Sequence, residues 1–207
     1  SQMGRYTIGI DVGGTKTAYG IFDEDNNLIA KKKHPTNQAL QPEEFFDEIL
    51  KHTNSLLRER KIALSHVSGI GIGVPSYVDF QEGYILKTSN IEKLKQFHVR
   101  TYLQKQLPDD IPVVIDNDSH AGALAEYTYG AGKGQKNMLY CPVSTGIASS
   151  IIIDGKLHRG DYGWAGESGH MIITPGEGIL CGCGNRGCLM SWCSGSMVGK
   201  HIQNWIA

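Results

Sequence analysis

The chain has 207 residues, 40% of them hydrophobic and 20% charged, a composition typical of a globular protein with one large or two small domains. Its formal net charge of −1 argues against nucleic acid or an anionic membrane as a partner, and no stretch approaches the roughly 20 apolar residues that span a bilayer. The 26 glycines are nearly twice the ordinary share of about 7%, so the places where glycine gathers are informative.

Strands joined by tight turns are predicted at the start of the chain, over residues 6–10, 17–22 and 28–33. Turn residues at Gly13-Gly14 and over 23–27 favour an antiparallel meander. A helix is predicted over 42–61, because proline suits its first position and glutamates suit its positive end. The apolar residues of this helix share one face, formed by Phe46, Ile49, Leu50, Leu56 and Leu57.

The middle of the chain contains a predicted strand, hairpin, helix and strand, over residues 67–74, 79–86, 99–107 and 112–115. Glycines at 69, 71 and 73 alternate with apolar residues in the first of these strands, which suggests close approach of another backbone. The last strand ends on Asp116-Asn117-Asp118. An alanine-rich helix over 119–129 is expected to be capped by that acidic end.

The last third of the chain contains predicted strands over 138–143 and 148–153. They flank a turn at Ser144-Thr145-Gly146, glycine then dominates from 160 to 187, and a helix begins near Met190. This second strand-turn-strand resembles the first one. The pattern indicates an N-terminal lobe over residues 1–116 and a C-terminal lobe over 117–207.

A glycine turn directly after the first strand is the first candidate site. Gly13 and Gly14 let backbone N–H groups approach an anion, while Thr15 adds a hydroxyl donor and Lys16 a positive charge. Asp11, at the end of the strand, is placed to face a magnesium ion. A Walker A loop is excluded, because that loop needs a Gly-Lys-Ser/Thr ending and a following helix. An ordinary hairpin with a charged tip is an equally good interpretation of these residues alone.

Asn117 and Asp118 form the second candidate site, at the end of an apolar strand. Asp118 suits the acceptance of a proton from a substrate hydroxyl, and Asn117 suits the orientation of neighbouring hydroxyls. Helix capping by Asp116, Asn117 or Asp118 is the alternative, and for any single one of them it is the better interpretation.

Clustered cysteines form the third candidate site. Cys181, Cys183 and Cys188 supply three ligands within eight residues, and the glycines between them permit a tight wrap around zinc. The fourth ligand is either Cys193 or His170. The spacing favours a metal over free thiols, and a closed site with four ligands is structural.

Taken together, these residues resemble the ROK family (repressors, open reading frames and sugar kinases). The resemblance begins at Ile8 and rests on six motifs in order, Asp11-x-Gly-Gly-Thr-Lys16, Gly73-x-Pro75, Asn117-Asp118-x-x-Ala121, Thr145-Gly146-Ile147, Glu167-x-Gly-His170 and Cys181-x-Cys-Gly-x-x-Gly-Cys188. It implies an α/β fold of the actin-like ATPase (ribonuclease H-like) type with two lobes. The family's kinases are longer than 207 residues, so the second lobe is expected to be incomplete at its C-terminus.

The resemblance implies an ATP-dependent kinase that phosphorylates a hexose, an N-acylhexosamine or a glycoside. Residues 13–16, with Asp11 and magnesium, would form the first phosphate loop, and residues 144–150 the second. Asp118 would be the general base. The residues implied in sugar binding are Asn90, Asn117, Asp118, Glu167 and His170.

His170 would also complete a structural zinc site with Cys181, Cys183 and Cys188, which leaves Cys193 outside it. The family's second phosphate loop is usually richer in glycine, whereas Ser144, Ala148 and Ser150 stand at such positions here. Residues His120 and Met190 also depart from the family's usual asparagine and glutamate.

Two other functions remain open at this point. One is a sugar-sensing transcriptional regulator of the same family, and the other is a catalytically inactive, zinc-stabilised sugar-binding module. Residues 1–4 show no charged-then-apolar leader pattern, and the cysteines favour a metal over disulfides, so the cytoplasm is expected. A sugar and ATP are the expected partners, without nucleic acid or membrane, and a homodimer is implied only by analogy with the family.

Overall fold

The structure, a computed structural model, describes residues 5–207. The expected lack of a leader pattern concerns residues 1–4, which lie outside the described residues. The chain divides into two compact units, one ending at Asp118 and the other beginning at Ser119. The division into lobes over 1–116 and 117–207, each with its own phosphate loop, stays a prediction.

The elements are, in chain order, β1 (Tyr6–Val12), β2 (Lys16–Phe22), β3 (Leu28–Pro35), α1 (Pro42–Glu59), the 3₁₀ helix Leu64–His66, β4 (Val67–Val74), β5 (Ser76–Asp79), β6 (Tyr84–Thr88), β7 (Phe97–His98), α2 (Val99–Gln104), β8 (Val113–Asn117), α3 (Asp118–Tyr129), β9 (Met138–Tyr140), β10 (Ser150–Ile153), β11 (Lys156–His158), the 3₁₀ helix Ser168–His170, α4 (Leu189–Cys193) and α5 (Gly195–Ile206). Every predicted strand and helix has a counterpart among them. The differences are at their boundaries.

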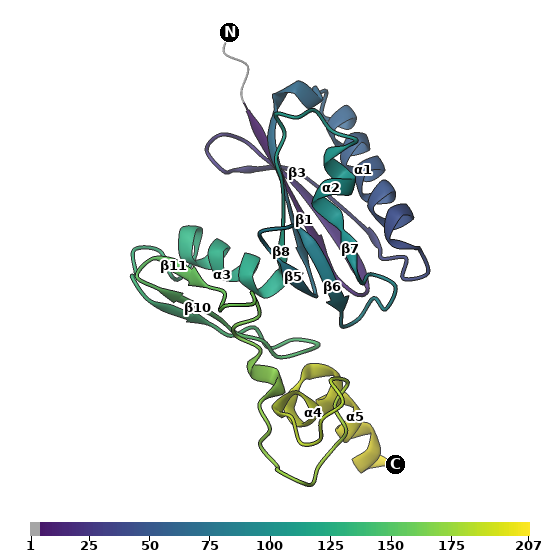
Figure 1. Cartoon of the computed structure of the whole chain (residues 1–207), viewed down its shortest axis with the longest axis vertical. Helices are drawn as coiled ribbons and strands as arrows, with labels where there is room; N and C mark the ends of the chain where they lie inside the picture. Colours follow the sequence, from purple (N-terminus) through teal and green to yellow (C-terminus); the bar gives the residue numbers. More distant parts are fainter. Residues whose placement is uncertain (1–4) are drawn as a thin grey trace. The chain divides into compact units, whose positions relative to one another are not determined.

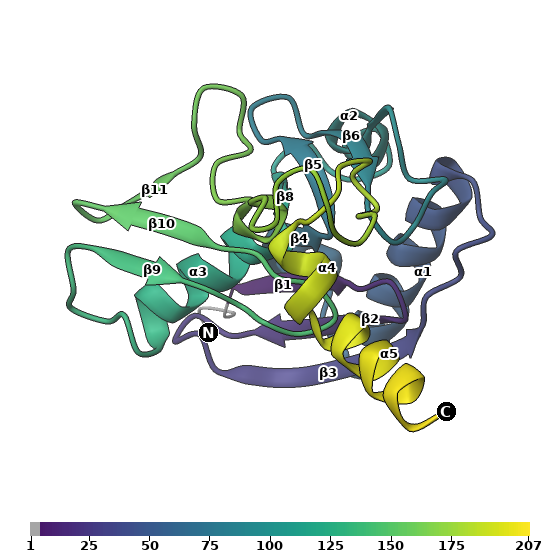
Figure 2. The same ribbon diagram turned by 90° about the horizontal axis from the view of Figure 1, so that it is seen from below.

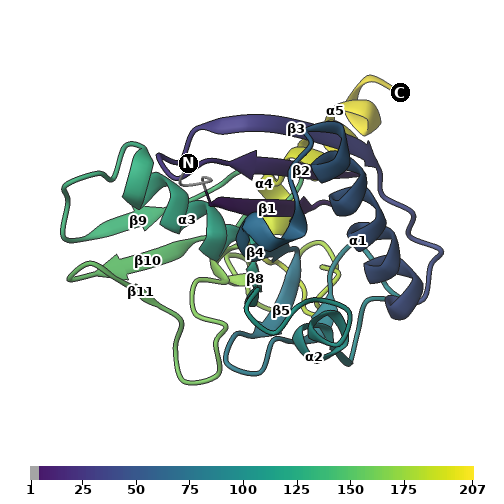
Figure 3. The same cartoon turned by 90° about the horizontal axis from the view of Figure 1, so that it is seen from above.

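The first unit is built on a five-stranded sheet in the order β3-β2-β1-β4-β8, whose first strands Figure 3 shows side by side. The predicted antiparallel meander is confirmed, because β2 pairs antiparallel with both β1 and β3. Strands β1, β4 and β8 run parallel to one another. Parallel neighbours end at the same edge of a sheet, so the polar residues that follow these strands are brought to one edge.

Helices α1 and α2 lie on the same side of this sheet (Figure 1) and bury the core. The predicted apolar face of α1 is confirmed, since Phe46, Ile49, Leu50, Leu56 and Leu57 are all buried. At its start, the backbone N–H of Gln41 donates to the carboxylate of Glu44 at 3.2 Å. The helix stops at Glu59 instead of residue 61 because Lys61 adopts a left-handed backbone, with φ of 55°.

Two predicted elements are shorter in the structure because of proline. Helix α2 ends at Gln104 instead of residue 107, and tighter turns carry the chain to Pro108, since a residue before proline disfavours the α conformation. Strand β9 ends at Tyr140 instead of residue 143, because Pro142 has no N–H to donate to a ladder.

Two glycines of β4, Gly69 and Gly71, lack the close contact with another backbone that the sequence predicts. A β-carbon added to Gly69 or Gly71 would meet other atoms only at 3.6 or 4.0 Å, which are ordinary contacts. The expectation of close backbone approach is therefore wrong at these two positions. With Gly9, Phe22 and Val114, these glycines line a shallow apolar hollow on the sheet.

The second unit contains a three-stranded antiparallel sheet in the order β11-β10-β9, with β10 in the middle (Figure 2). Helix α3 packs against it so closely that a β-carbon on Gly122 would lie 2.9 Å from the hydroxyl of Tyr140. Between residues 160 and 187 the one regular element described is the 3₁₀ helix Ser168–His170, as the density of glycine predicts. None of the described helices combines the length and the hydropathy needed to cross a membrane.

A cluster of histidines joins β3 to α1 in the first unit. The rings of His34 and His52 stack with centroids 3.9 Å apart, and His34 Nε2 lies 2.9 Å from the hydroxyl of Tyr19. Burial, followed by the nearby His34 and Lys32, lowers the pKa of His52, while Glu48 opposes this effect. Protonation of His52 therefore opposes the packing of β3 on α1.

The first unit should lose stability in mild acid. A histidine whose pKa is lowered in the folded state contributes stability above its ordinary value of 6.5 and loses that contribution as the pH falls. The free energy of unfolding, measured with urea between pH 7.5 and 5, should decrease as the pH is lowered. His52→Gln should make that decline shallower, with His66→Gln as the matched control. An unchanged slope in His52→Gln would contradict the assignment.

Candidate active site and metal centre

The carboxyl ends of β1, β4 and β8 bring polar residues to one edge of the sheet. Asp11 pairs with Gly73, and Gly73 pairs with Asp116, so these residues form one row across three strands. At about 4.8 Å per strand, the backbones of Asp11 and Asp116 are about 10 Å apart. Asp118 follows as the first residue of α3, and its side chain is exposed. Of these three carboxylates, those of Asp11 and Asp118 are exposed at the edge, whereas that of Asp116 is buried.

The predicted first phosphate loop, residues 13–16, is the tight hairpin between β1 and β2. The N–H of Gly13 donates to the carbonyl of Lys16 at 2.9 Å, and a β-carbon on Gly13 would lie 2.7 Å from that same oxygen. The hydroxyl of Thr36 donates to the carbonyl of Gly13 at 2.7 Å. Glycine at position 13 is thus needed for steric reasons, as a tight hairpin requires, and the role of this hairpin as a phosphate loop stays a prediction.

Asn90 and Gly14, which are far apart in sequence, lie together in the first unit. A β-carbon on Gly14 would come within 2.9 Å of the Asn90 β-carbon. This places the predicted sugar contact Asn90 beside the predicted first phosphate loop. Thr15 and Lys16 are both exposed at the same hairpin.

Asp11 lies near the end of β1, just before the predicted first phosphate loop. Its side chain keeps an exposed face, but the surrounding protein shields it from bulk water, and this burial raises its pKa. A divalent cation beside the carboxylate would offset that penalty. The magnesium site predicted at Asp11 stays a prediction.

The triplet Asp116-Asn117-Asp118 spans the end of β8 and the start of α3, and its members make different contacts. Asp116 is buried, and its carboxylate accepts the backbone N–H of Asn117 at 2.8 Å. The amide Nδ2 of Asn117 donates to the carbonyl of Ser76 at 3.0 Å, which fixes the plane of that amide. Helix α3 begins at Asp118 itself, one residue earlier than predicted.

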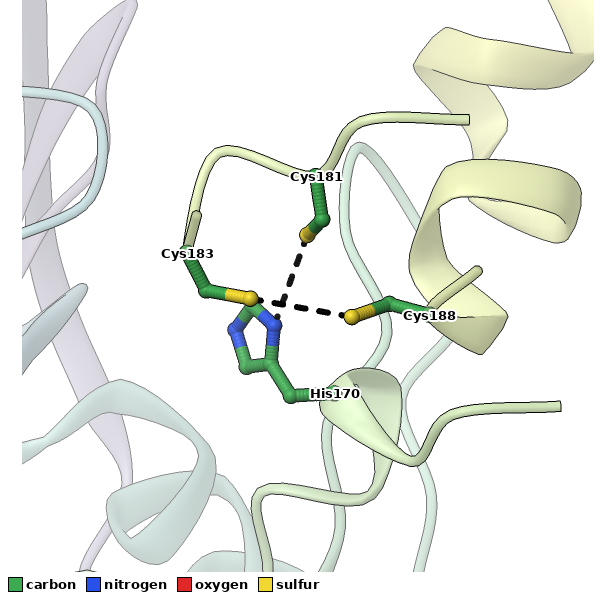
Figure 4. Close-up of side chains that lie close together, drawn as sticks. All are labelled: His170, Cys181, Cys183 and Cys188. Atoms are coloured by element: carbon green, nitrogen blue, oxygen red, sulfur yellow. Dashed lines mark hydrogen bonds between the residues drawn. The ribbon is translucent and has the colours of Figure 1, made fainter. Parts of the chain in front are cut away.

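His170, Cys181, Cys183 and Cys188 converge on one point in the second unit (Figure 4). The sulfurs of Cys183 and Cys188 are 3.6 Å apart, and Cys181 Sγ lies 3.6 Å from His170 Nδ1. Tetrahedral zinc, with bonds of about 2.3 Å to sulfur and about 2.1 Å to nitrogen, places two sulfurs about 3.8 Å apart and a sulfur and a nitrogen about 3.6 Å apart. These four side chains therefore fit zinc, and Cys193, exposed on α4, stands outside the group.

The thiols of the cluster differ in how readily they lose a proton. Burial acts to raise the pKa of Cys181, but hydrogen bonds, led by one from the backbone of Cys183, lower it overall. Burial raises the pKa of Cys188. Zinc binds thiolates, so it would have to displace the Cys188 proton, and zinc affinity should fall in acid.

Glu167 directly precedes the 3₁₀ helix that carries His170. Burial raises the pKa of Glu167, and the nearby His170 and His120 act in the opposite direction. The N–H of His170 donates to the carbonyl of Glu167 at 3.1 Å. The structure thus places these two predicted sugar-binding residues on one turn, next to the candidate zinc site.

The predicted second phosphate loop, residues 144–150, begins with a tight turn. The N–H of Ser144 donates to the carbonyl of Gly146 at 2.9 Å, while Thr145 is exposed. The start of α5 holds this turn, because the N–H of Gly195 donates to the carbonyl of Ser144 at 2.7 Å. The role of this turn in phosphate binding stays a prediction.

Sequence reasoning missed two residues that support Glu167. His120 Nε2 lies 3.2 Å from the carbonyl of Ala165, and Ser149 bonds to Gly166. Departure from the family's usual residue singled out His120 but gave it no role. Ser149 carried no signal of its own, because its partner is 17 residues away.

The cysteine cluster should bind one zinc ion per chain. Cys183→Ser should weaken zinc binding by more than the 10- to 100-fold that loss of an outer-shell partner costs, because it removes a ligand. Competition with a chromogenic chelator measures this affinity. Cys193→Ser is the control and should bind like the wild type. Equal zinc affinity in Cys183→Ser and the wild type would refute the site.

Comparison with known proteins places this geometry in context. Residues 7–207 match the ROK family. The chain is 36% identical over 197 residues to a glucokinase of Streptomyces coelicolor, covering 95% of this chain and 59% of that protein. It is 36% identical over 199 residues to an N-acetylmannosamine kinase of Vibrio cholerae, covering 95% and 64%. It is also 31% identical over 203 residues to a xylose repressor of Bacillus spizizenii, covering 98% and 51%.

Among solved structures, a ROK family glucokinase from Streptomyces griseus in complex with glucose and AMPPNP superposes with a TM-score of 0.82 at 33% identity. The superposition covers 96% of this chain and 60% of that one. This likeness confirms the predicted α/β fold of the actin-like ATPase type. The chain spans about 59% of the length of the first curated relative it matches. The match across nearly all of the chain shows that it belongs to the ROK family.

Proposed function

We propose that the protein is an ATP-dependent sugar kinase that transfers the γ-phosphate of ATP to a hydroxyl of a hexose, an N-acylhexosamine or a glycoside. The observation that carries the proposal is the edge of the first sheet, where Asp11 and Asn117 lie at the carboxyl ends of parallel strands and Asp118 follows, beside a glycine hairpin. Similarity to a glucokinase and to an N-acetylmannosamine kinase supports the same activity.

Asp118 acts as the general base. Its exposed carboxylate accepts the proton of the sugar hydroxyl as that oxygen attacks phosphorus. Asn117, whose amide plane is fixed by Ser76, orients a neighbouring hydroxyl. Positioning of this kind supplies most of the catalysis in phosphoryl transfer, because little covalent work is asked of the protein.

The remaining sugar contacts come from Asn90, Glu167 and His170. Because His170 Nδ1 faces Cys181, its Nε2–H is the nitrogen that donates to a sugar hydroxyl. His170, Cys181, Cys183 and Cys188 would hold a structural zinc ion, which would fix the tautomer and the orientation of the His170 ring.

The phosphates of ATP are bound by the two predicted phosphate loops. Backbone N–H groups of these loops approach the phosphate oxygens, apart from those of Gly13, Ser144, Ala148 and Ser149, which are bonded to carbonyls of the chain. Lys16 adds positive charge. Magnesium, held near Asp11, neutralises phosphate charge when bound.

A regulator of the same family is the second candidate, favoured by 31% identity to a xylose repressor. The glucokinase of Streptomyces coelicolor and the N-acetylmannosamine kinase of Vibrio cholerae are more similar to the chain than this repressor, at 36% identity. A sugar-binding module without catalysis is the third candidate, motivated by the serines of the second phosphate loop. Turnover of ATP in the presence of sugar separates the kinase from both.

Several expectations about partners stay predictions. Cytoplasmic localisation rests on the clustered cysteines, which suit a metal better than disulfides. The lack of a nucleic-acid or membrane partner rests on the formal net charge of −1. A homodimer rests on analogy with the family.

A coupled assay with ATP, magnesium and a panel of glucose, N-acetylmannosamine and a glucoside tests the proposal. We expect turnover with at least one sugar. Asp118→Asn should lower kcat by about 10²- to 10⁴-fold with little change in the KM for sugar, because it removes the base but keeps the shape of the side chain.

Asp109→Asn, in the exposed loop before β8, is the matched control and should keep the wild-type rate. Absence of turnover on every sugar would overturn the kinase assignment. Undiminished turnover in Asp118→Asn would overturn the role of Asp118.

A further inference from the structure

We propose that Ser149 couples the binding of nucleotide to the binding of sugar, by tying the predicted second phosphate loop to the segment that carries Glu167. The inference rests on the proposed kinase function and names a positioning residue within it. Both segments belong to the second unit of the chain.

The link consists of hydrogen bonds to a single carbonyl. The backbone N–H of Ser149 donates to the carbonyl of Gly166 at 2.8 Å, and the Ser149 hydroxyl donates to the same oxygen at 2.8 Å. The N–H of Ser168 also reaches this oxygen, at 2.7 Å. Gly166 precedes Glu167, so the orientation of the Glu167 backbone depends on this contact.

Close packing makes the link stiff. Gly166 has a φ of +100°, and a β-carbon there would overlap the carbonyl oxygen of Ser149. A β-carbon on Gly169 would likewise overlap the carbonyl oxygen of Ile147. The residues before and within the 3₁₀ helix thus touch the phosphate loop at two carbonyls, and neither segment can shift without moving the other.

Buried side chains support the link from the other side. Ser149 is 7% exposed and Ser150 is fully buried, and the hydroxyls of Ser150 and Ser119 lie 2.8 Å apart. His120 Nε2, also buried, lies 3.2 Å from the carbonyl of Ala165. Ser119 and His120 lie in the first turn of helix α3, so that turn contacts both the predicted phosphate loop and the segment that carries Glu167.

The functional consequence follows from this shared geometry. Phosphates that order residues 144–150 also order Gly166 through Ser149. A sugar that orders Glu167 likewise orders residues 144–150 through the same contact. Each ligand then meets a segment that the other has already fixed, so the second ligand binds with a smaller entropic penalty. The hydroxyl of Ser149 supplies the second donor of this link, and alanine or glycine at position 149 would remove that donor.

Calorimetric titration of magnesium-AMPPNP, without and with saturating amounts of the sugar that gives turnover, measures the coupling. The wild type should bind AMPPNP at least about fivefold more tightly with sugar, the lower end of common coupling factors, and the reverse titration should give the same factor. Ser149→Ala should lower the factor at least about twofold, toward a value of 1, because it removes one hydrogen bond of the link. Ser149→Thr, which keeps the hydroxyl, should restore it.

Ser68→Ala is the matched control, because it removes a hydroxyl-to-carbonyl bond of the same kind, to Tyr6 in the first unit. It should keep the wild-type coupling factor. A merely structural loss in Ser149→Ala would weaken both ligands in single titrations and leave their ratio unchanged, which would overturn the inference. Turnover with independent binding of the two ligands would overturn it while leaving the kinase assignment intact. Failure to bind sugar or AMPPNP would overturn both.

Discussion

The close approach of two glycines to two carbonyl oxygens is the constraint on which the candidate site depends. Gly166 and Gly169 leave no room for a β-carbon against Ser149 and Ile147. Through these contacts, the segment that carries Glu167 and His170 packs directly against residues 144–150. His170 in turn closes the cysteine cluster, whose spacing fits tetrahedral zinc. The candidate zinc site, the predicted sugar-binding residues Glu167 and His170, and the predicted phosphate turn are therefore parts of one packed structure within the second unit.

The local features of this fold could be predicted from the sequence, because they depend on near neighbours. The apolar face of α1 and the strands around Gly13 follow from periodicity and turn residues. The errors came where a single residue decides a boundary, such as Lys61 with its left-handed backbone. The purpose assigned to Gly69 and Gly71 was wrong because a glycine pattern does not say whether another backbone lies nearby.

The candidate site divides in the same way. The cysteine spacing, the glycine hairpin and the triplet after β8 were visible as motifs, since each is continuous in sequence. The bonds of Ser149 to Gly166 and of His120 to Ala165 join residues 17 and 45 positions apart, so no local pattern reveals them. Ser150, one of the residues that stand in place of glycine in the second phosphate loop, is buried, and its hydroxyl lies 2.8 Å from that of Ser119. The excess of glycine thus serves close packing in one segment and the bend of a hairpin in another.

Amide hydrogen exchange of the zinc-loaded protein, compared with the same protein after chelation, tests this account most directly. If the cysteine cluster, the Glu167 segment and residues 144–150 form one packed structure, removal of zinc should speed exchange in all three segments. Strand β4, in the other unit, should exchange at the same rate in both samples. Faster exchange confined to residues 181–188, with residues 144–150 unchanged, would contradict the account.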